Sequence, residues 1–216
     1  MGSKTLAGYL LAIGPIVMLA VFIFLFDALI GGAEEGVLGE AKIKADIAAG
    51  MENYSLTKLV AFLGGGGMLA MMLGYTLWAR LLQGEGKKGA TLATVASIAI
   101  PVAAAGMMMS MDFNFAAMNA WDKGDTSSAL ILGAVGEYAG NDFIWLFLMI
   151  NVGFIGLATV LQLTDKISRS IGGILAVITL VMFVGWFTSF EGLDFLWMLW
   201  MATTVAAGIN LIRQKA

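Results

Sequence analysis

Six long stretches without a charged residue are the strongest constraint on the fold of this chain. They are Thr5–Phe26, Leu59–Ala79, Gly89–Met111, Phe143–Thr164, Ser170–Phe190 and Phe195–Ile212, each 18 to 23 residues long. A membrane-spanning helix needs about 20 predominantly apolar residues, because each residue rises ~1.5 Å and the hydrocarbon core is ~30 Å thick. The runs also lack the alternation of barrel strands, which favours helices. The sequence predicts an all-α, polytopic membrane protein: a bundle of six transmembrane helices that forms one integral membrane domain over residues 1–216.

Composition excludes the other broad classes. Hydrophobic residues make up 60% and charged residues 12% of the chain, whereas soluble domains average about 45–50% and about 25%. The net charge of −3, with twelve basic residues spread along the chain, provides no basic surface for nucleic acid. The first run is longer than the ~7–15-residue apolar core of a secretory signal peptide, so it is expected to be an anchor and not a cleaved leader.

The distribution of Lys and Arg predicts the orientation in the cell membrane. With six spans, both termini and the second and fourth loops share one side, which holds eight basic residues and two acidic ones; the other side holds four basic residues and thirteen acidic ones. Basic residues in short loops concentrate on the cytoplasmic side, so both termini are expected to be cytoplasmic. Four tryptophans fall near the expected outer helix ends and are predicted to form an interfacial belt, namely Trp145, Trp186, Trp197 and Trp200.

Two segments of the outer loops are predicted to be short interfacial helices. Glu40–Ala49 in the first loop mixes charged and apolar residues. Thr126–Gly136 in the third loop is charge-free but too short to span a bilayer, so an interfacial or re-entrant helix is expected. Either Asp125 or Thr126 could cap the start of this second helix.

The absence of two residue types limits the chemistry that the chain can perform. The sequence contains no histidine and no cysteine, which removes the usual ligands of haem, zinc, copper and iron–sulfur clusters and the commonest catalytic base. Every lysine lies outside the six runs, so a retinal Schiff base is not expected either. The 15 methionines are interpreted as gap-filling core residues, with a Cu(I) site as the alternative. We expect no metal and no cofactor.

Acidic residues at the outer helix ends form the most specific candidate site. Asp27, Asp112, Asp142, Glu191 and Asp194 all fall where runs are expected to end on the outer side. Several carboxylates that converge there could hold a cation or admit a proton. The alternative is that they mark helix boundaries on the acidic side of the protein.

Two further features lie within the runs. Asn151 is near the centre of the fourth run, where it could contact a solute or ion, or form a hydrogen bond between helices. Gly64, Gly67, Ala70 and Gly74 are spaced by three or four residues in the second run, so they form one smooth helical stripe. Such stripes allow close helix packing, either within the fold or against a partner.

Three stretches together carry a family resemblance. They are Ala7-Gly8-Tyr9-Leu10-Leu11, Leu77-Trp78-Ala79-Arg80-Leu81-Leu82 and Ser168-Arg169-Ser170-Ile171-Gly172-Gly173. In order and spacing the chain resembles a family of uncharacterised six-helix bacterial integral membrane proteins, classed as a domain of unknown function. The resemblance covers nearly the whole chain. It implies a six-helix fold with a long first outer loop and brings no catalytic residues.

The sequence thus favours a non-enzymatic membrane protein that acts through helix packing, as an accessory or scaffolding subunit. Its expected partners are the lipid bilayer and either another membrane protein or further copies of itself, and not nucleic acid. The alternative is a small transporter or channel for a cation or small solute that uses the outer carboxylates. An intramembrane enzyme is the least supported hypothesis, because no single run carries two catalytic side chains within its membrane-spanning part.

Overall fold

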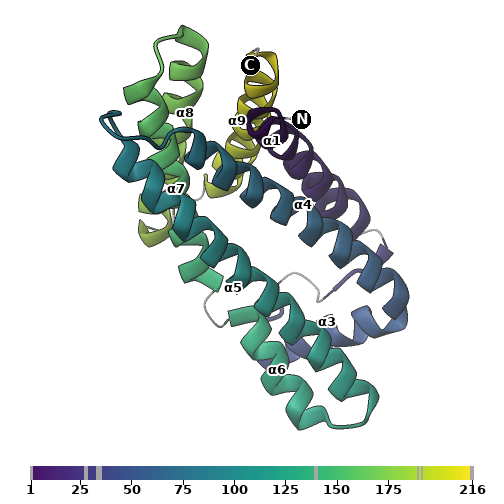
Figure 1. Ribbon diagram of the computed structural model, residues 1–216. Coiled ribbons are helices and arrows are strands. Elements are labelled where there is room, and N and C mark those ends of the chain that lie inside the picture. Colours follow the sequence, from purple (N-terminus) through teal and green to yellow (C-terminus); the bar gives the residue numbers. More distant parts are fainter. Residues whose placement is uncertain are drawn as a thin grey trace. The chain divides into compact units, whose positions relative to one another are not determined.

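The computed structural model describes residues 2–26, 29–32, 36–138, 141–188, 190 and 192–214, without the side chains of Ile23, Asn141 and Asp142. Helices account for nearly all of these residues, and none of them lies in a strand. In chain order the elements are α1 (Ser3–Leu19), a π-helical segment η1 (Ala20–Phe26), α3 (Gly39–Glu52), α4 (Tyr54–Leu81), α5 (Ala90–Asp122), α6 (Thr126–Tyr138), α7 (Asn141–Gln162), α8 (Lys166–Thr188) and α9 (Leu193–Arg213) (Figure 1).

Six helical stretches are long and apolar enough to cross a membrane. They are Ser3–Phe26, Tyr54–Leu81, Ala90–Asp122, Thr126–Gln162, Lys166–Thr188 and Leu193–Arg213, the fourth of which includes both α6 and α7. Each contains one of the charge-free runs or most of it. The prediction of an all-helical chain with six such stretches is therefore confirmed for the described residues.

The helices extend beyond the runs where charged residues lie outside the apolar part. Helix α5 continues from the end of its run through Asp112 to Asp122, so Asp112 lies inside the helix and not at its end. The placement of Asp112 at a helix terminus was therefore wrong. A charged residue is costly only within hydrocarbon, so it does not end a helix that packs elsewhere, and Ala117 of this extension is fully buried.

The chain divides into two compact units. The first unit comprises Met1–Ile16, Gly67–Ala104 and Trp145–Ala216, and the second comprises Val17–Gly66 and Ala105–Ile144. Helices α4 and α5 each contribute one part to each unit.

In the first unit, glycines bring helix backbones together. A Cβ atom added to Gly208 of α9 would lie 2.6 Å from the carbonyl oxygen of Gly8 in α1, and one added to Gly156 of α7 would lie 2.6 Å from that of Gly172 in α8. Helices associate in lipid through close van der Waals contact, so residues without side chains favour these crossings. Large buried side chains fill the remaining interior, including Leu11, Met71, Tyr75, Ile100, Leu148, Leu175 and Trp200.

In the second unit, α3 and α6 cover the distal part of α5 (Figure 1). Ile43 and Ile47 of α3 pack with Ala117 of α5 and Ala129 of α6. Helix α3 contains residues 40–49 and α6 contains residues 126–136, the two segments in which short helices were predicted; their place at a membrane interface stays a prediction. Asp125 caps α6, because its Oδ1 accepts the backbone N–H of Ser128 at 3.0 Å.

The turn between α5 and α6 is fixed by a glycine. Gly124 has a φ of +78°, a left-handed conformation that favours glycine. Its N–H donates to the carbonyl of Trp121, and the N–H of Asp125 donates to that of Ala120. This is the Schellman pattern, which satisfies the last carbonyls of a helix and reverses the chain.

Candidate functional site

Two of the five acidic candidates can be placed with their side chains. Asp112 in α5 and Asp194 in the first turn of α9 are both exposed, and they belong to different units. Asp142 lies in the first turn of α7, but the structure does not describe its side chain. Asp27 and Glu191 lie outside the described residues. Among the described residues, no three Asp or Glu side chains come close enough together to hold a metal ion. The outer cation site stays a prediction.

Asn151 is a different kind of candidate, because it is buried in the first unit with an unpaired acceptor. Its side chain is 1% exposed on α7. The amide nitrogen donates to the carbonyl oxygen of Phe147, one turn earlier, at 2.7 Å. That bond orients the amide, since a flip would set two oxygens against each other. The Oδ1 atom then has no hydrogen-bond partner among the described residues. It can accept from one N–H or O–H donor of a ligand or water molecule.

A closed ring of hydrogen bonds lies in the same unit and was not predicted. The indole nitrogen of Trp200 donates to the hydroxyl of Tyr75 at 2.9 Å. This hydroxyl bonds to Oγ1 of Thr204, and the Thr204 hydroxyl donates to the carbonyl of Trp200 at 2.8 Å. Because an indole N–H can only donate and a carbonyl can only accept, the direction of every bond is determined. The ring ties α4 to α9 and satisfies all its polar side-chain groups.

Trp200 corrects the expectation of an aromatic belt. Its side chain is fully buried and contacts the ring of Trp145 edge-on. A tryptophan of the membrane interface would keep its N–H near water, whereas the N–H of Trp200 is bonded to Tyr75 inside the unit. No periodicity could have paired two residues 125 positions apart.

The glycine stripe of α4 lies against the first helical stretch of the same chain. A Cβ on Gly74 would lie 2.8 Å from Cγ of Leu11, and one on Gly64 would lie 3.0 Å from Cζ of Phe22. The carbonyl oxygen of Gly67 lies 2.7 Å from the position of a Cβ on Gly14. Ala70 is half-buried. All four stripe residues thus lie on a packed or partly packed part of α4.

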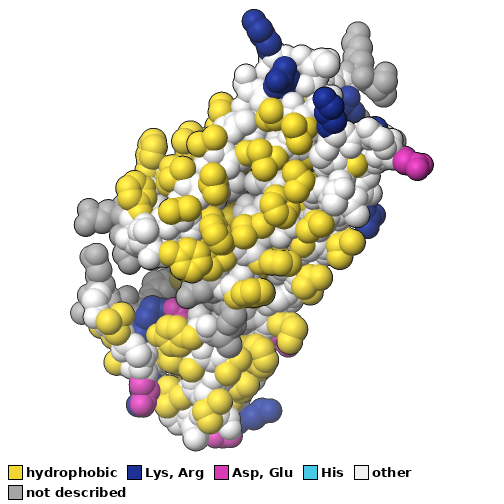
Figure 2. All heavy atoms as spheres, turned by 90° about the vertical axis from the view of Figure 1, so that its left-hand side faces the viewer, with side chains coloured by type: hydrophobic (Ala, Val, Ile, Leu, Met, Phe, Trp, Pro, Cys, Tyr) yellow, Lys and Arg dark blue, Asp and Glu magenta, His cyan; other side chains and the backbone are white. Residues whose placement is uncertain are grey.

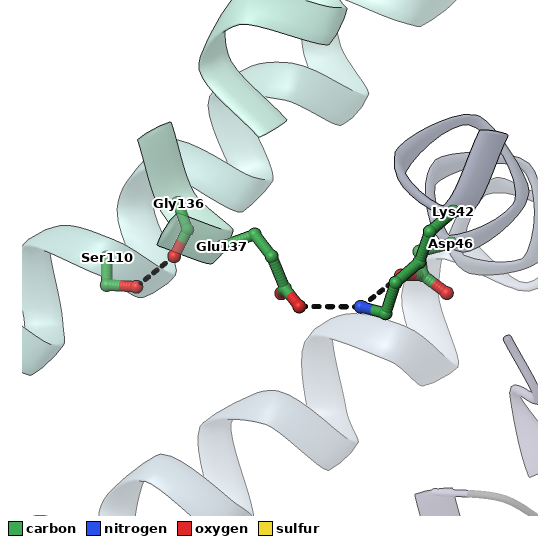
Figure 3. Close-up of polar contacts among 5 residues, drawn as sticks. All are labelled: Lys42, Asp46, Ser110, Gly136 and Glu137. Carbon is green, nitrogen blue, oxygen red and sulfur yellow. Dashed lines mark hydrogen bonds and ion pairs between the residues drawn. The ribbon is translucent and has the colours of Figure 1, made fainter. Parts of the chain in front are cut away.

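The second unit contains a charged cluster between α3 and α6 (Figure 3). The amine of Lys42 lies 2.6 Å from Glu137 and 3.1 Å from Asp46. The hydrogen bond that Lys42 donates to Glu137 raises the pKa of Lys42 above its ordinary value of 10.5, against the opposing effect of partial burial. Beside this cluster, the hydroxyl of Ser110 in α5 donates to the carbonyl of Gly136. These contacts hold α6 between α3 and α5, and Glu137 is therefore occupied by a lysine.

Comparison with known protein families, curated proteins and solved structures finds no match to this chain. The likeness to the six-helix bacterial family stays a prediction from its three motifs.

Proposed function

We propose that this chain is an integral membrane protein that works without catalysis, as an accessory or scaffolding subunit of a membrane complex. Both termini would lie in the cytoplasm, and α3 and α6 would lie at the outer membrane surface. The observation that carries the proposal is the closed ring of Tyr75, Trp200 and Thr204. Its side-chain polar groups are engaged with one another, so they serve to fix helix positions and not to bind a substrate.

Other buried hydroxyls of the first unit support the same interpretation. The hydroxyls of Thr76, Thr159, Thr179 and Thr203 each donate to a carbonyl of their own helix three or four residues earlier. Together with the close glycine crossings, these bonds favour a permanently packed interior. The outward apolar surface is then the part of the molecule available for lipid and for another membrane protein.

The test is the assembly state of the chain at its native expression level. Membranes from the host are cross-linked, solubilised gently and separated by native electrophoresis, and the bands are quantified by mass spectrometry. The proposal expects the chain in a discrete band with another membrane protein at fixed stoichiometry, and a reciprocal tag on that partner should retrieve the chain. A chain found alone under these conditions would contradict a scaffolding role.

One observation favours the second candidate, a transporter or channel for a cation or small solute. The unpaired Oδ1 of Asn151 is a buried acceptor of the kind that lines solute pathways. Purified protein in liposomes would be tested for uptake of ²²Na⁺, ⁸⁶Rb⁺ and protons. If the chain is a transporter, the ion flux should exceed that of protein-free vesicles. Asn151→Leu should abolish this flux, and Thr179→Val should leave it unchanged. Vesicles with no such flux would exclude a pathway for these three ions.

A further inference from the structure

In the first unit, the start of α8 is hydrogen-bonded to the end of α9 through a buried serine. The Oγ atom of Ser168, near the start of α8, accepts hydrogen bonds from Asn210 at 2.8 Å and from Gln214 at 2.6 Å. Ser168 is only 2% exposed. These two bonds connect the first turn of α8 with the C-terminal end of α9, so the residues next to them in sequence lie at the same end of this helix pair.

Three exposed cations flank this junction. Lys166 and Arg169 lie two residues before and one residue after Ser168, and Arg213 directly precedes Gln214. We call these three residues the basic cluster. None of them forms a salt bridge within the part of the chain that the structure describes. Lysines of α3 differ, because Lys42 and Lys44 both have carboxylate partners.

The acidic residue nearest in sequence to the cluster is engaged in another interaction. Asp165 accepts the backbone N–H of Ser168 at 2.8 Å and so caps α8. That bond, then one from the Ser168 hydroxyl, and the charge of Lys4 lower the pKa of Asp165 below its ordinary value. Asp165 therefore stays ionised, and its single negative charge offsets one of the three positive charges. The other two positive charges have no carboxylate partner among the described residues.

Exposed apolar stripes run along both helices to the basic cluster. On α9 the stripe passes through Phe195, Met198, Ala202, Ala206 and Ile209 and ends at Arg213, with spacings of three or four residues. On α8, Ile167, Ile174 and Val181 are exposed at intervals of seven, which places them on one face. Figure 2 shows hydrophobic side chains over much of one face of the molecule, and Lys and Arg side chains are among those near the end where Figure 1 marks the termini.

We propose that the basic cluster binds the phosphate headgroup of an anionic phospholipid, whose acyl chains lie along the exposed stripes of α8 and α9. This inference rests on the proposal that the helices span a bilayer. Guanidinium groups bind phosphate oxygens through two parallel hydrogen bonds, and Lys166 adds a third positive charge. A soluble phosphate would use the cations alone, whereas a lipid also uses the apolar stripes that end at them. Zwitterionic lipids carry an ammonium group beside the phosphate, and its positive charge cancels the attraction of the cluster.

The experiment compares lipids on the full-length chain purified in a neutral detergent. Binding of phosphatidylglycerol and of phosphatidylcholine is measured by native mass spectrometry and by the shift in thermal unfolding. Each cation near an anionic lipid surface contributes about fivefold in affinity. The triple variant Lys166→Gln, Arg169→Gln, Arg213→Gln should therefore lose about a hundredfold in phosphatidylglycerol affinity, while phosphatidylcholine binding should stay unchanged.

The matched control removes three charges from the same unit but from another place, the last turn of α4 and the turn that follows it. Arg80→Gln, Lys87→Gln, Lys88→Gln has the same net charge as the test variant and should keep most of the affinity for phosphatidylglycerol. An equal loss in both variants would show diffuse attraction and overturn a local site. If the triple variant does not fold, Arg169→Gln and Arg213→Gln are used singly, and each should weaken binding about fivefold.

Two further measurements are needed. One distinguishes a lipid phosphate from a soluble phosphate, and the other tests membrane spanning independently of the lipid site. Inorganic phosphate and glycerol 3-phosphate at millimolar concentration should not displace phosphatidylglycerol; efficient displacement would identify a soluble-anion site and overturn the lipid assignment. Membrane integration is scored separately by resistance of the wild-type chain to carbonate extraction. A chain that resists extraction but shows no preference for phosphatidylglycerol contradicts the lipid site alone, whereas an extractable chain contradicts membrane spanning.

Discussion

Some buried polar side chains of this protein have all their polar atoms hydrogen-bonded, whereas the acceptor of Asn151 has no donor among the described residues. Thr204 is paired on both sides, through Tyr75 and the carbonyl of Trp200. Asn151 is buried to the same degree, yet only its amide nitrogen is bonded. An unpaired buried polar group costs about 1–3 kcal/mol. The two residues should therefore respond oppositely to replacement by an apolar side chain.

Replacing Asn151 by Leu should leave the free energy of unfolding unchanged or raise it by about 1 kcal/mol, because the unpaired acceptor is removed. The measurement is reversible denaturation of the detergent-purified protein. Thr204→Val is the matched control and should lower the free energy of unfolding by roughly 1 kcal/mol, because it leaves the Tyr75 hydroxyl without its acceptor. If Asn151→Leu destabilises the protein as much as the control, Oδ1 has a bound partner in solution.

The ion pairs of Lys42 should make the thermal stability of the second unit depend on pH in the alkaline range. Its pKa is raised by Glu137, so its contribution to stability is complete below the unfolded value of about 10.5 and is lost as the pH rises through the higher folded value. The midpoint of thermal unfolding should therefore fall more steeply above pH 10.5 in the wild type than in Lys42→Met. Lys123→Met, which removes an exposed lysine just after α5, should keep the steep fall. Identical profiles for the wild type and Lys42→Met would show that the ion pair contributes nothing.

At the scale of helices, the sequence was most informative about apolar length. The six charge-free runs locate every candidate span, because hydrocarbon thickness sets a length that composition reveals directly. Helix ends were harder to predict: α5 continues past Asp112, where its extension packs against α3 and α6, and ends only at the Gly124 turn. The hydrogen-bonded pairing of Tyr75 with Trp200 was beyond reach, because local patterns carry no information about which helices become neighbours.

Adding a methyl group should affect stability differently at a glycine where two helices cross and at a glycine that faces open space. A Cβ on Gly208 would lie 2.6 Å from the backbone nitrogen of Ala12 and from the oxygen of Gly8, and backbone atoms cannot rotate away. Gly208→Ala should therefore lower the free energy of unfolding by about 1–3 kcal/mol. A Cβ on Gly66 of α4 would meet nothing within 4 Å, so Gly66→Ala should be neutral or slightly stabilising. Equal effects of the two variants would contradict the close approach of α1 and α9.

At the scale of the whole molecule, basic residues are divided between the two units. The described cations of the first unit are Lys4, Arg80, Lys87, Lys88, Lys166, Arg169 and Arg213, and those of the second are Lys42, Lys44, Lys58 and Lys123. The same residues are separated when the loop counts assign them to a predicted cytoplasmic side and a predicted outer side. The candidate acids were less predictable, because helix ends place residues along a membrane normal but not around it, and only lateral position brings carboxylates together.

The orientation proposed for the chain can be tested by reporters at three positions. Basic residues in short loops are retained on the cytoplasmic side, so a fluorescent protein that folds only in the cytoplasm should give signal after Ala216 and when inserted after Gly86. Inserted after Gly124, in the turn between α5 and α6, it should be dark, and alkaline phosphatase at that position should be active. Because four predicted spans separate Gly86 from Ala216, signal at Ala216 but not at Gly86 would require an odd number of spans between these two positions. The fully reversed pattern would instead place both termini outside. In that case the basic cluster at the α8–α9 end would face the outer leaflet.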